Sequence, residues 1–138
     1  MITMRGASVM IAAALSASVT LTVPAQAFDL NGAWASSPEN CAKIFTRKGS
    51  QIAFSDNSDI YGGGFIVAGN RIVGKTGQCR IKARKEDGKQ IHLISECASD
   101  IMYQNMQLSL TIVDPDTVIR IFPGLDDMQM SFGRCPAL

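Results

Sequence analysis

The residues with the most specific chemistry in this sequence are its four cysteines, Cys41, Cys79, Cys97 and Cys135. Successive cysteines are 38, 18 and 38 positions apart, so no pair has the C-x-x-C spacing of zinc sites and thiol redox motifs. An even number of cysteines in a small exported domain is typical of structural disulfides. We therefore predict two disulfide bonds and no metal site, with three pairings left open by spacing alone.

A predicted hairpin favours one of these pairings. Around Cys79 and around Cys97, apolar and polar residues alternate as in strands, and a turn signal at 86–88 joins the two segments. Both cysteines then lie on the inner face of the hairpin, at positions that can permit a Cys79–Cys97 bond. The other bond, Cys41–Cys135, would tie the start of the domain to its end.

Side chains suited to acid–base catalysis are few. His92 is the only histidine, which excludes a metal site built from several histidines and leaves a catalytic triad one candidate base. The carboxylate pairs Asp114/Asp116 and Asp126/Asp127 lie in turn-like segments, where turn chemistry explains them. No serine has a G-x-S-x-G environment. We expect a protein that is not an enzyme and has no cofactor.

Basic residues gather on one predicted strand. Arg80, Lys82 and Arg84 alternate with apolar residues, and His92 lies on the facing strand. These four residues are a candidate binding face for a periplasmic acidic protein or an anionic envelope component, such as a polymer or a lipid headgroup. The alternative is a solvated face on which Arg80 pairs with Glu96 across the strands.

Four methionines, Met102, Met106, Met128 and Met130, lie in the last third of the chain. Thioethers can bind copper(I), whose softness suits sulfur ligands. Three of the four occupy alternating positions beside other apolar residues, as core methionines do. We favour the core interpretation.

The first 27 residues predict a secretory signal peptide. Arg5 provides the positive start, 7–21 is an apolar stretch, and Ala25-Gln26-Ala27 is an A-x-A cleavage site. We expect cleavage there and a single periplasmic or secreted domain, 28–138, with no transmembrane segment. That domain has 12 acidic and 12 basic residues, and this neutral charge argues against nucleic acid as a partner.

The mature chain predicts a mainly β domain with one short helix near its start. Ser37 can cap this helix, Pro38 suits its first position, Phe45 continues its apolar face, and Gly49 is a plausible stop. Strand patterns follow at 51–54, 65–68, 71–75, 79–84, 91–97, 105–113 and 128–132, with a further strand after a turn at 114–117.

These seven or eight short strands are joined mainly by tight turns and predict an antiparallel meander. Such a meander avoids exposed edges by forming a small barrel, or a half-barrel closed by the helix. Across the turn at 114–117, we expect Ile112 to lie beside Ile119 and Leu110 beside Ile121, because the inner faces then agree.

The motif Asn31-Gly32-Ala33-Trp34 stands at the start of the mature domain. This G-x-W opening resembles that of lipocalin-like small barrels, including bacterial periplasmic metalloprotease inhibitors. The resemblance implies an eight-stranded barrel with Trp34 at one end, and a candidate protease-contacting segment at Phe28, Asp29 and Leu30. The chain differs from these proteins in its helix after Trp34 and in its four-cysteine pattern. From the residues themselves, Trp34 is expected to be a large core anchor.

Together these features predict a binding or inhibitor-like protein. The alternatives are a lipocalin-like carrier of a small apolar ligand and a passive structural protein of the envelope. An internal cavity lined by Trp34, Phe65 and the methionines would favour the carrier. A filled core with an exposed, ordered Arg80–His92 face, or a protruding N-terminus, would favour the binder.

Overall fold

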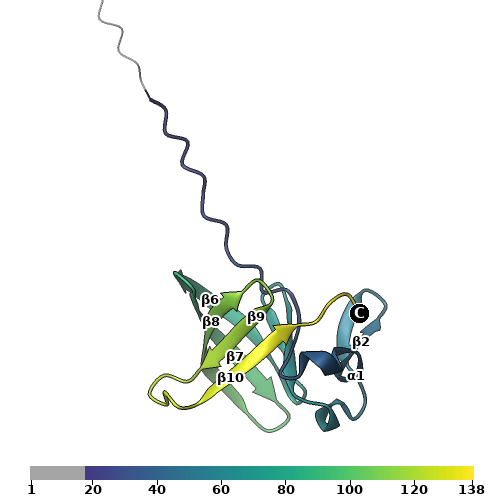
Figure 1. The fold of residues 1–138 in the computed structure, drawn as a ribbon. Helices are drawn as coiled ribbons and strands as arrows, with labels where there is room; N and C mark the ends of the chain where they lie inside the picture. Colours follow the sequence, from purple (N-terminus) through teal and green to yellow (C-terminus); the bar gives the residue numbers. More distant parts are fainter. Residues whose placement is uncertain (1–17) are drawn as a thin grey trace, which may run out of the picture.

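The computed structural model of this chain describes residues 18–138. Residues 18–27 have no regular secondary structure and extend away from the folded domain (Figure 1). Residues 1–17, which hold most of the predicted signal peptide, lie outside the described residues. Within 18–138, no helix is long and apolar enough to cross a membrane.

Eight antiparallel strands form a closed barrel in the order β1-β10-β9-β8-β7-β6-β5-β4, which confirms the predicted fold class. Neighbours in the sequence pair through hairpins from β4 to β10, and β1 closes the barrel by pairing with both β4 and β10. The strands are β1 Gly32–Ala35, β4 Gly64–Ala68, β5 Arg71–Val73, β6 Gly77–Asp87, β7 Gln90–Ser99, β8 Tyr103–Asp114, β9 Thr117–Ile121 and β10 Gln129–Arg134.

The connection from β1 to β4 forms a small unit beside the barrel (Figure 1). Its elements are the 3-10 turn η1 Pro38–Asn40, the helix α1 Cys41–Ile44, the hairpin strands β2 Phe45–Lys48 and β3 Gln51–Phe54, and the 3-10 turn η2 Ser58–Ile60. The predicted short helix is present, but its expected continuation through Phe45 is wrong. Phe45 has extended dihedrals, φ −122° and ψ 153°, and pairs with Phe54 at 5.0 Å between ring centroids.

Two apolar cores result from the alternation of side chains along β1. Trp34 points into the barrel with Val67, Leu93 and other inward residues. Its neighbours Ala33 and Ala35 belong to a second core, which the connecting unit covers from outside. The barrel wall is therefore buried on both faces where this unit packs against it.

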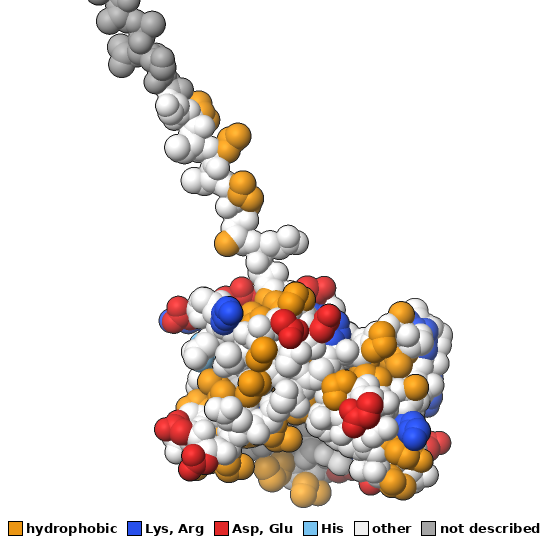
Figure 2. All heavy atoms as spheres, in the orientation of Figure 1, with side chains coloured by type: hydrophobic (Ala, Val, Ile, Leu, Met, Phe, Trp, Pro, Cys, Tyr) orange, Lys and Arg blue, Asp and Glu red, His pale blue; other side chains and the backbone are white. Residues whose placement is uncertain are grey.

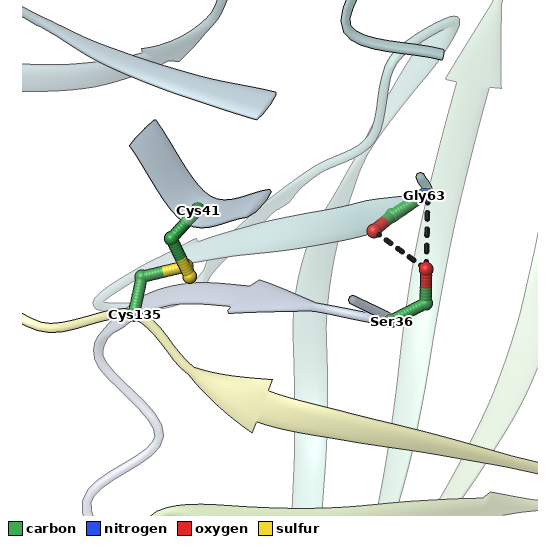
Figure 3. Close-up of a disulfide and its surroundings, with 4 residues drawn as sticks. All are labelled: Ser36, Cys41, Gly63 and Cys135. Carbon is green, nitrogen blue, oxygen red and sulfur yellow. Dashed lines mark hydrogen bonds between the residues drawn. A yellow bond between two sulfur atoms is a disulfide. The ribbon is translucent and has the colours of Figure 1, made fainter. Parts of the chain in front are cut away.

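Both predicted disulfides are confirmed. Cys79 and Cys97 are directly opposite one another in the β6–β7 ladder. The Cys41–Cys135 bond joins α1 to the chain just after β10 (Figure 3). This second bond fastens the connecting unit to the barrel.

The predicted register of β8 with β9 is wrong by one residue. The structure pairs Ile112 with Val118 and Leu110 with Arg120, because Val113 is an extra residue in a β-bulge before the turn. A one-residue shift moves side chains to the opposite face of a strand. Arg120 consequently shares the inner face with Leu110.

A second bulge changes the basic strand. Lys82 is the extra residue between Ile81 and Ala83, so alternation restarts after it and Arg84 lies opposite Leu93. Leu93 is a buried member of the barrel core. Arg84 is thus on the inner side of β6, whereas the sequence pattern predicted it on the outer face with Lys82.

The two disulfides are expected to differ in their contribution to stability. The Cys41–Cys135 bond spans 94 residues and the Cys79–Cys97 bond spans 18. Loop-closure entropy then predicts a loss of about 4–5 kcal/mol for the double variant Cys41→Ala/Cys135→Ala and about 3 kcal/mol for Cys79→Ala/Cys97→Ala. Urea unfolding of both variants measures this difference, and an equal or reversed order would contradict it.

Gly64 provides a test of the junction between β1 and β4. A Cβ atom there would lie 2.3 Å from the Trp34 carbonyl oxygen, so the paired backbones must separate. We expect Gly64→Ala to lower the free energy of unfolding by about 1–3 kcal/mol. Gly63→Ala is the matched control, because its nearest neighbour would be the Ser36 hydroxyl at 3.9 Å. Equal effects of the two substitutions in urea unfolding would disprove the close approach.

Candidate ligand cavity

The barrel contains an apolar cavity of about 300 Å³. This volume is at the lower end of the range for small-molecule sites. Its wall consists almost entirely of aliphatic, aromatic and thioether side chains, with glycines near the ends of β4, β5 and β6. The principal lining side chains are those of Leu30, Phe65, Val67, Ile72, Leu93, Met106, Leu108, Leu110, Arg120, Met130 and Phe132.

Aromatic packing fills one end of the barrel and leaves the cavity toward the other. Trp34 is fully buried and its indole N–H donates to the Leu30 carbonyl at 2.8 Å. Its ring stacks on Phe65 at 6.2 Å, and Phe65 meets Phe132 edge-on at 5.1 Å. Phe65 and Phe132 line the cavity, but Trp34 does not. Trp34 therefore forms part of the floor beneath the cavity.

Arg134 closes the filled end. Its guanidinium lies 4.3 Å from the Trp34 ring, and it donates to the carbonyl oxygens of Asn31 and Asp29 at 2.6 and 2.7 Å. The side chain also approaches the Asp116 carboxylate at 3.3 Å. This arginine joins the start of the domain, the β8–β9 turn and β10. Sequence analysis missed its role, because nothing in the local pattern pairs residue 134 with residue 34.

The candidate N-terminal contact segment is attached to the same end of the barrel. Leu30 is 2 % exposed, and the Phe28 amide donates to Glu86 at 3.2 Å. Arg84 donates to the Phe28 carbonyl and pairs with Glu86. Phe28 and Leu30 thus pack against the protein's own barrel, and only the side chain of Asp29 stays in solvent.

The four residues of the candidate basic face do not form one group. Arg80 and Lys82 share the Glu96 carboxylate at 3.4 and 3.5 Å on the outside of the barrel. Arg84 is on the other side of β6, at the filled end. His92 places Nδ1 3.0 Å from the Ser109 hydroxyl. The prediction of one common basic face is therefore wrong, because the bulge at Lys82 turns Arg84 to the other side of β6 from Arg80 and Lys82.

The pairing at Glu96 lowers the pKa of its carboxyl. Desolvation raises the pKa of this carboxyl, but the charge of Lys82 and hydrogen bonds from Tyr103, Arg80 and Lys82 outweigh that effect and lower the pKa below its ordinary value. Desolvation and the same carboxylate raise the pKa of Tyr103. Much of the positive charge on this part of the surface is thus neutralised within the protein.

Among residues 18–138, Arg120 is the one charged side chain that lines the cavity. Its register partners, Leu110 and Met130, also line the cavity. Of the arginine side chains in residues 18–138, that of Arg120 alone makes no hydrogen bond or ion pair. Its guanidinium lies 4.6 Å from the Phe122 ring, and burial lowers its pKa from the ordinary value. The shifted β8–β9 register hid this residue from sequence analysis.

Ser95 adds a second polar atom beside the cavity. Its register partner Met106 lines the cavity, so the Ser95 side chain is on the same inner side. The residue is fully buried and its hydroxyl has no hydrogen-bond partner in the structure. The buried Ser109 hydroxyl differs, because it meets the His92 imidazole.

Exposed apolar side chains surround the end of the barrel at which the cavity lies. Figure 2 shows hydrophobic groups along the lower edge of the domain, where Figure 1 places the β9–β10 loop. These side chains belong to η2 and its flank, the β7–β8 turn and the β9–β10 segment: Ile60, Tyr61, Ile101, Met102, Tyr103, Leu125, Met128 and Met130. Exposed aspartates occupy the same connections: Asp59, Asp100, Asp126 and Asp127.

The methionines divide between wall and rim. Met106 and Met130 line the cavity, and Met130 is also 44 % exposed at the rim. Met102 and Met128 are about half exposed and do not line the cavity. Within residues 18–138, no group of three or more His, Cys, Asp or Glu side chains is arranged to hold a metal ion.

A scan against protein-family models finds no match for this chain, and searches of curated proteins and of solved structures find none either.

The unpaired hydroxyl of Ser95 yields a stability prediction. Ser95→Ala removes a buried polar group without a partner, so we expect the free energy of unfolding to rise by about 1 kcal/mol. Ser109→Ala is the matched control, because it removes a buried hydroxyl that has a partner, and we expect it to lower stability by about 1 kcal/mol. Urea unfolding distinguishes these signs. Destabilisation by both substitutions would mean that the Ser95 hydroxyl is paired.

Proposed function

We propose that this protein is a non-enzymatic carrier that binds a small, largely apolar ligand inside its barrel. The observation that carries the proposal is the cavity of about 300 Å³ in a domain that otherwise has well-packed cores. Apolar cavities of this kind take up apolar molecules readily, because they offer water few hydrogen bonds. The feature that the sequence named as favouring the carrier, a cavity lined by Trp34, Phe65 and the methionines, is met in part. Phe65, Met106 and Met130 line the cavity, whereas Trp34 does not.

The surroundings of the cavity support the same function. Aromatic packing and Arg134 hold the floor, two disulfides brace the wall and the connecting unit, and exposed apolar side chains surround the mouth. A rigid wall lowers the entropic cost of binding. Apolar groups at the rim give an apolar ligand favourable contacts as it enters.

The inhibitor-like alternative has less support. It relies on a free N-terminal segment or on a continuous basic face. Phe28 and Leu30 are instead attached to the barrel, and Arg84 is separated from Arg80 and Lys82. The resemblance to lipocalin-like barrels is compatible with the carrier, because closed barrels of this size can hold one small ligand.

We propose export to the periplasm or to the outside of the cell as the setting for this function. Disulfides are stable in such oxidising compartments, and the two bonds are consistent with that location. Cleavage of the signal peptide after Ala27 would leave Phe28 as the first residue, next to its contacts with Glu86.

Binding of the neutral fluorophore 1-naphthylamine tests the carrier function, because its two fused rings match a cavity of about 300 Å³. We expect saturable, one-to-one fluorescence enhancement with the wild-type protein. Leu108→Trp fills part of the cavity and should weaken binding by about tenfold, equivalent to about 1.4 kcal/mol. Fluorescence titration at constant protein concentration measures the affinity.

Gln107→Trp is the matched control. It introduces the same side chain one position earlier on β8, where the residue is exposed and points away from the cavity. We expect this variant to bind the fluorophore as the wild type does. Absence of saturable binding, or equal weakening by the two substitutions, would overturn the proposal and favour a passive structural role.

A further inference from the structure

The cavity contains one feature that a purely apolar ligand does not use. Arg120 shares the inner face of the barrel with Leu110 and Met130, and it lines the same cavity. It is held there by the bulge at Val113, since without that extra residue the side chain would be on the outer face. Its position is thus a consequence of strand register and does not depend on a mobile loop.

The guanidinium is incompletely satisfied. It has five N–H donors, yet it makes no hydrogen bond or ion pair with any residue of the described chain. It lies 4.6 Å from the centre of the Phe122 ring. Arg120 is partly buried, and partial desolvation of an unpaired charge is unfavourable, so an anion brought into the cavity would relieve that cost.

The shape of the cavity restricts what this anion can be. Guanidinium pairs best with planar or tetrahedral oxyanions, and a carboxylate is the smallest group that can accept two parallel N–H bonds. The remaining wall is aliphatic and aromatic. At about 30 Å³ for each water-sized unit, a 300 Å³ cavity holds roughly ten non-hydrogen atoms. With its two oxygens counted, these properties describe a single-chain carboxylate of about eight to ten carbons.

The aspartates around the mouth do not reverse this preference. Asp59, Asp100, Asp126 and Asp127 are exposed, so water and salt screen their charges. Arg120 instead acts at hydrogen-bond distance in a partly desolvated site, where electrostatic interactions are stronger. If these aspartates determined selectivity, the protein would instead prefer cationic amphiphiles, and the experiment below includes such a ligand.

We infer that the ligand is a single-chain anionic amphiphile, with its carboxylate bound by Arg120 and its chain enclosed by the apolar wall of the barrel. This inference rests on the proposed carrier function and adds the chemical class of the ligand. Arg120 is then the specificity-determining residue, and the apolar wall provides affinity that depends little on the headgroup.

Displacement of 1-naphthylamine by three ten-carbon ligands tests the inference. The ligands are decanoate, decanol and decylammonium, which share a chain and differ in charge. The proteins are the wild type, Arg120→Gln and the control Arg71→Gln. Arg71 is an exposed arginine on β5 that bonds Gln78 at 2.9 Å and does not line the cavity.

We expect Arg120→Gln to weaken decanoate binding by about tenfold or more, the usual effect of losing a charge-assisted hydrogen bond. Decanol binding should change by less than about twofold, because the alcohol has no charge for the arginine to neutralise. Decylammonium should be the weakest ligand of the wild type. Arg71→Gln should leave all three affinities unchanged. Arg120→Lys, which keeps the charge and loses the planar fork, should retain more decanoate affinity than Arg120→Gln.

The outcomes separate the inference from the carrier function. Binding of the fluorophore and of decanol, with decanoate affinity equal in wild type and Arg120→Gln, would overturn the inference and leave the carrier function intact. Strongest binding of decylammonium would also overturn it and assign selectivity to the aspartates. Absence of fluorophore binding by the wild type would overturn both proposals. If Arg120→Gln melts at a lower temperature than the wild type, the inference is tested instead by comparing the decanoate affinities of Arg120→Lys and the wild type.

Discussion

The stacking of Arg134 on Trp34 is the interaction on which the rest of the structure depends. It places a cation 4.3 Å from a fully buried indole and uses the same guanidinium to hold the carbonyl oxygens of Asn31 and Asp29. The first and last strands of the barrel pair at this point, so the same two residues close the barrel and form its floor. Because aromatic bulk is concentrated at this end, the smaller side chains at the other end leave the cavity unfilled.

Two single-residue bulges decide which charged groups this cavity contacts. Lys82 moves Arg84 from the outer surface to the filled end, where it binds the N-terminal segment. Val113 moves Arg120 to the cavity wall. Bulges alter the face of every later side chain in a strand at the cost of one unpaired residue. The positions of charged groups inside this barrel thus follow from strand register more than from composition. A domain with no net charge thereby acquires arginines on the inner side of its wall.

Much of the fold could be predicted from local patterns. The strand patterns at 65–68 and 105–113 correctly indicated strands, and the even number of cysteines correctly indicated disulfides. The candidate site was harder to predict from the sequence, because it depends on the Arg120 side chain lying on the inner face of the barrel. In residues 117–121 one alternating set, Thr117, Ile119 and Ile121, is entirely β-branched, whereas the other contains Arg120, so the pattern favoured the wrong face. The helix expected to continue through Phe45 ended earlier, because pairing with Phe54 buries that ring more completely.

By itself the sequence determined a small, neutral, mainly β domain with four paired cysteines and Trp34 as a core anchor. These properties follow from short-range rules of alternation, turns and cysteine number. The tertiary structure alone decided that the barrel encloses a cavity, that the N-terminal segment is attached to it, and that Arg120 points inward. Each of these depends on the sum of side-chain volumes across strands distant in sequence, or on a bulge whose one-residue shift has almost no local signature.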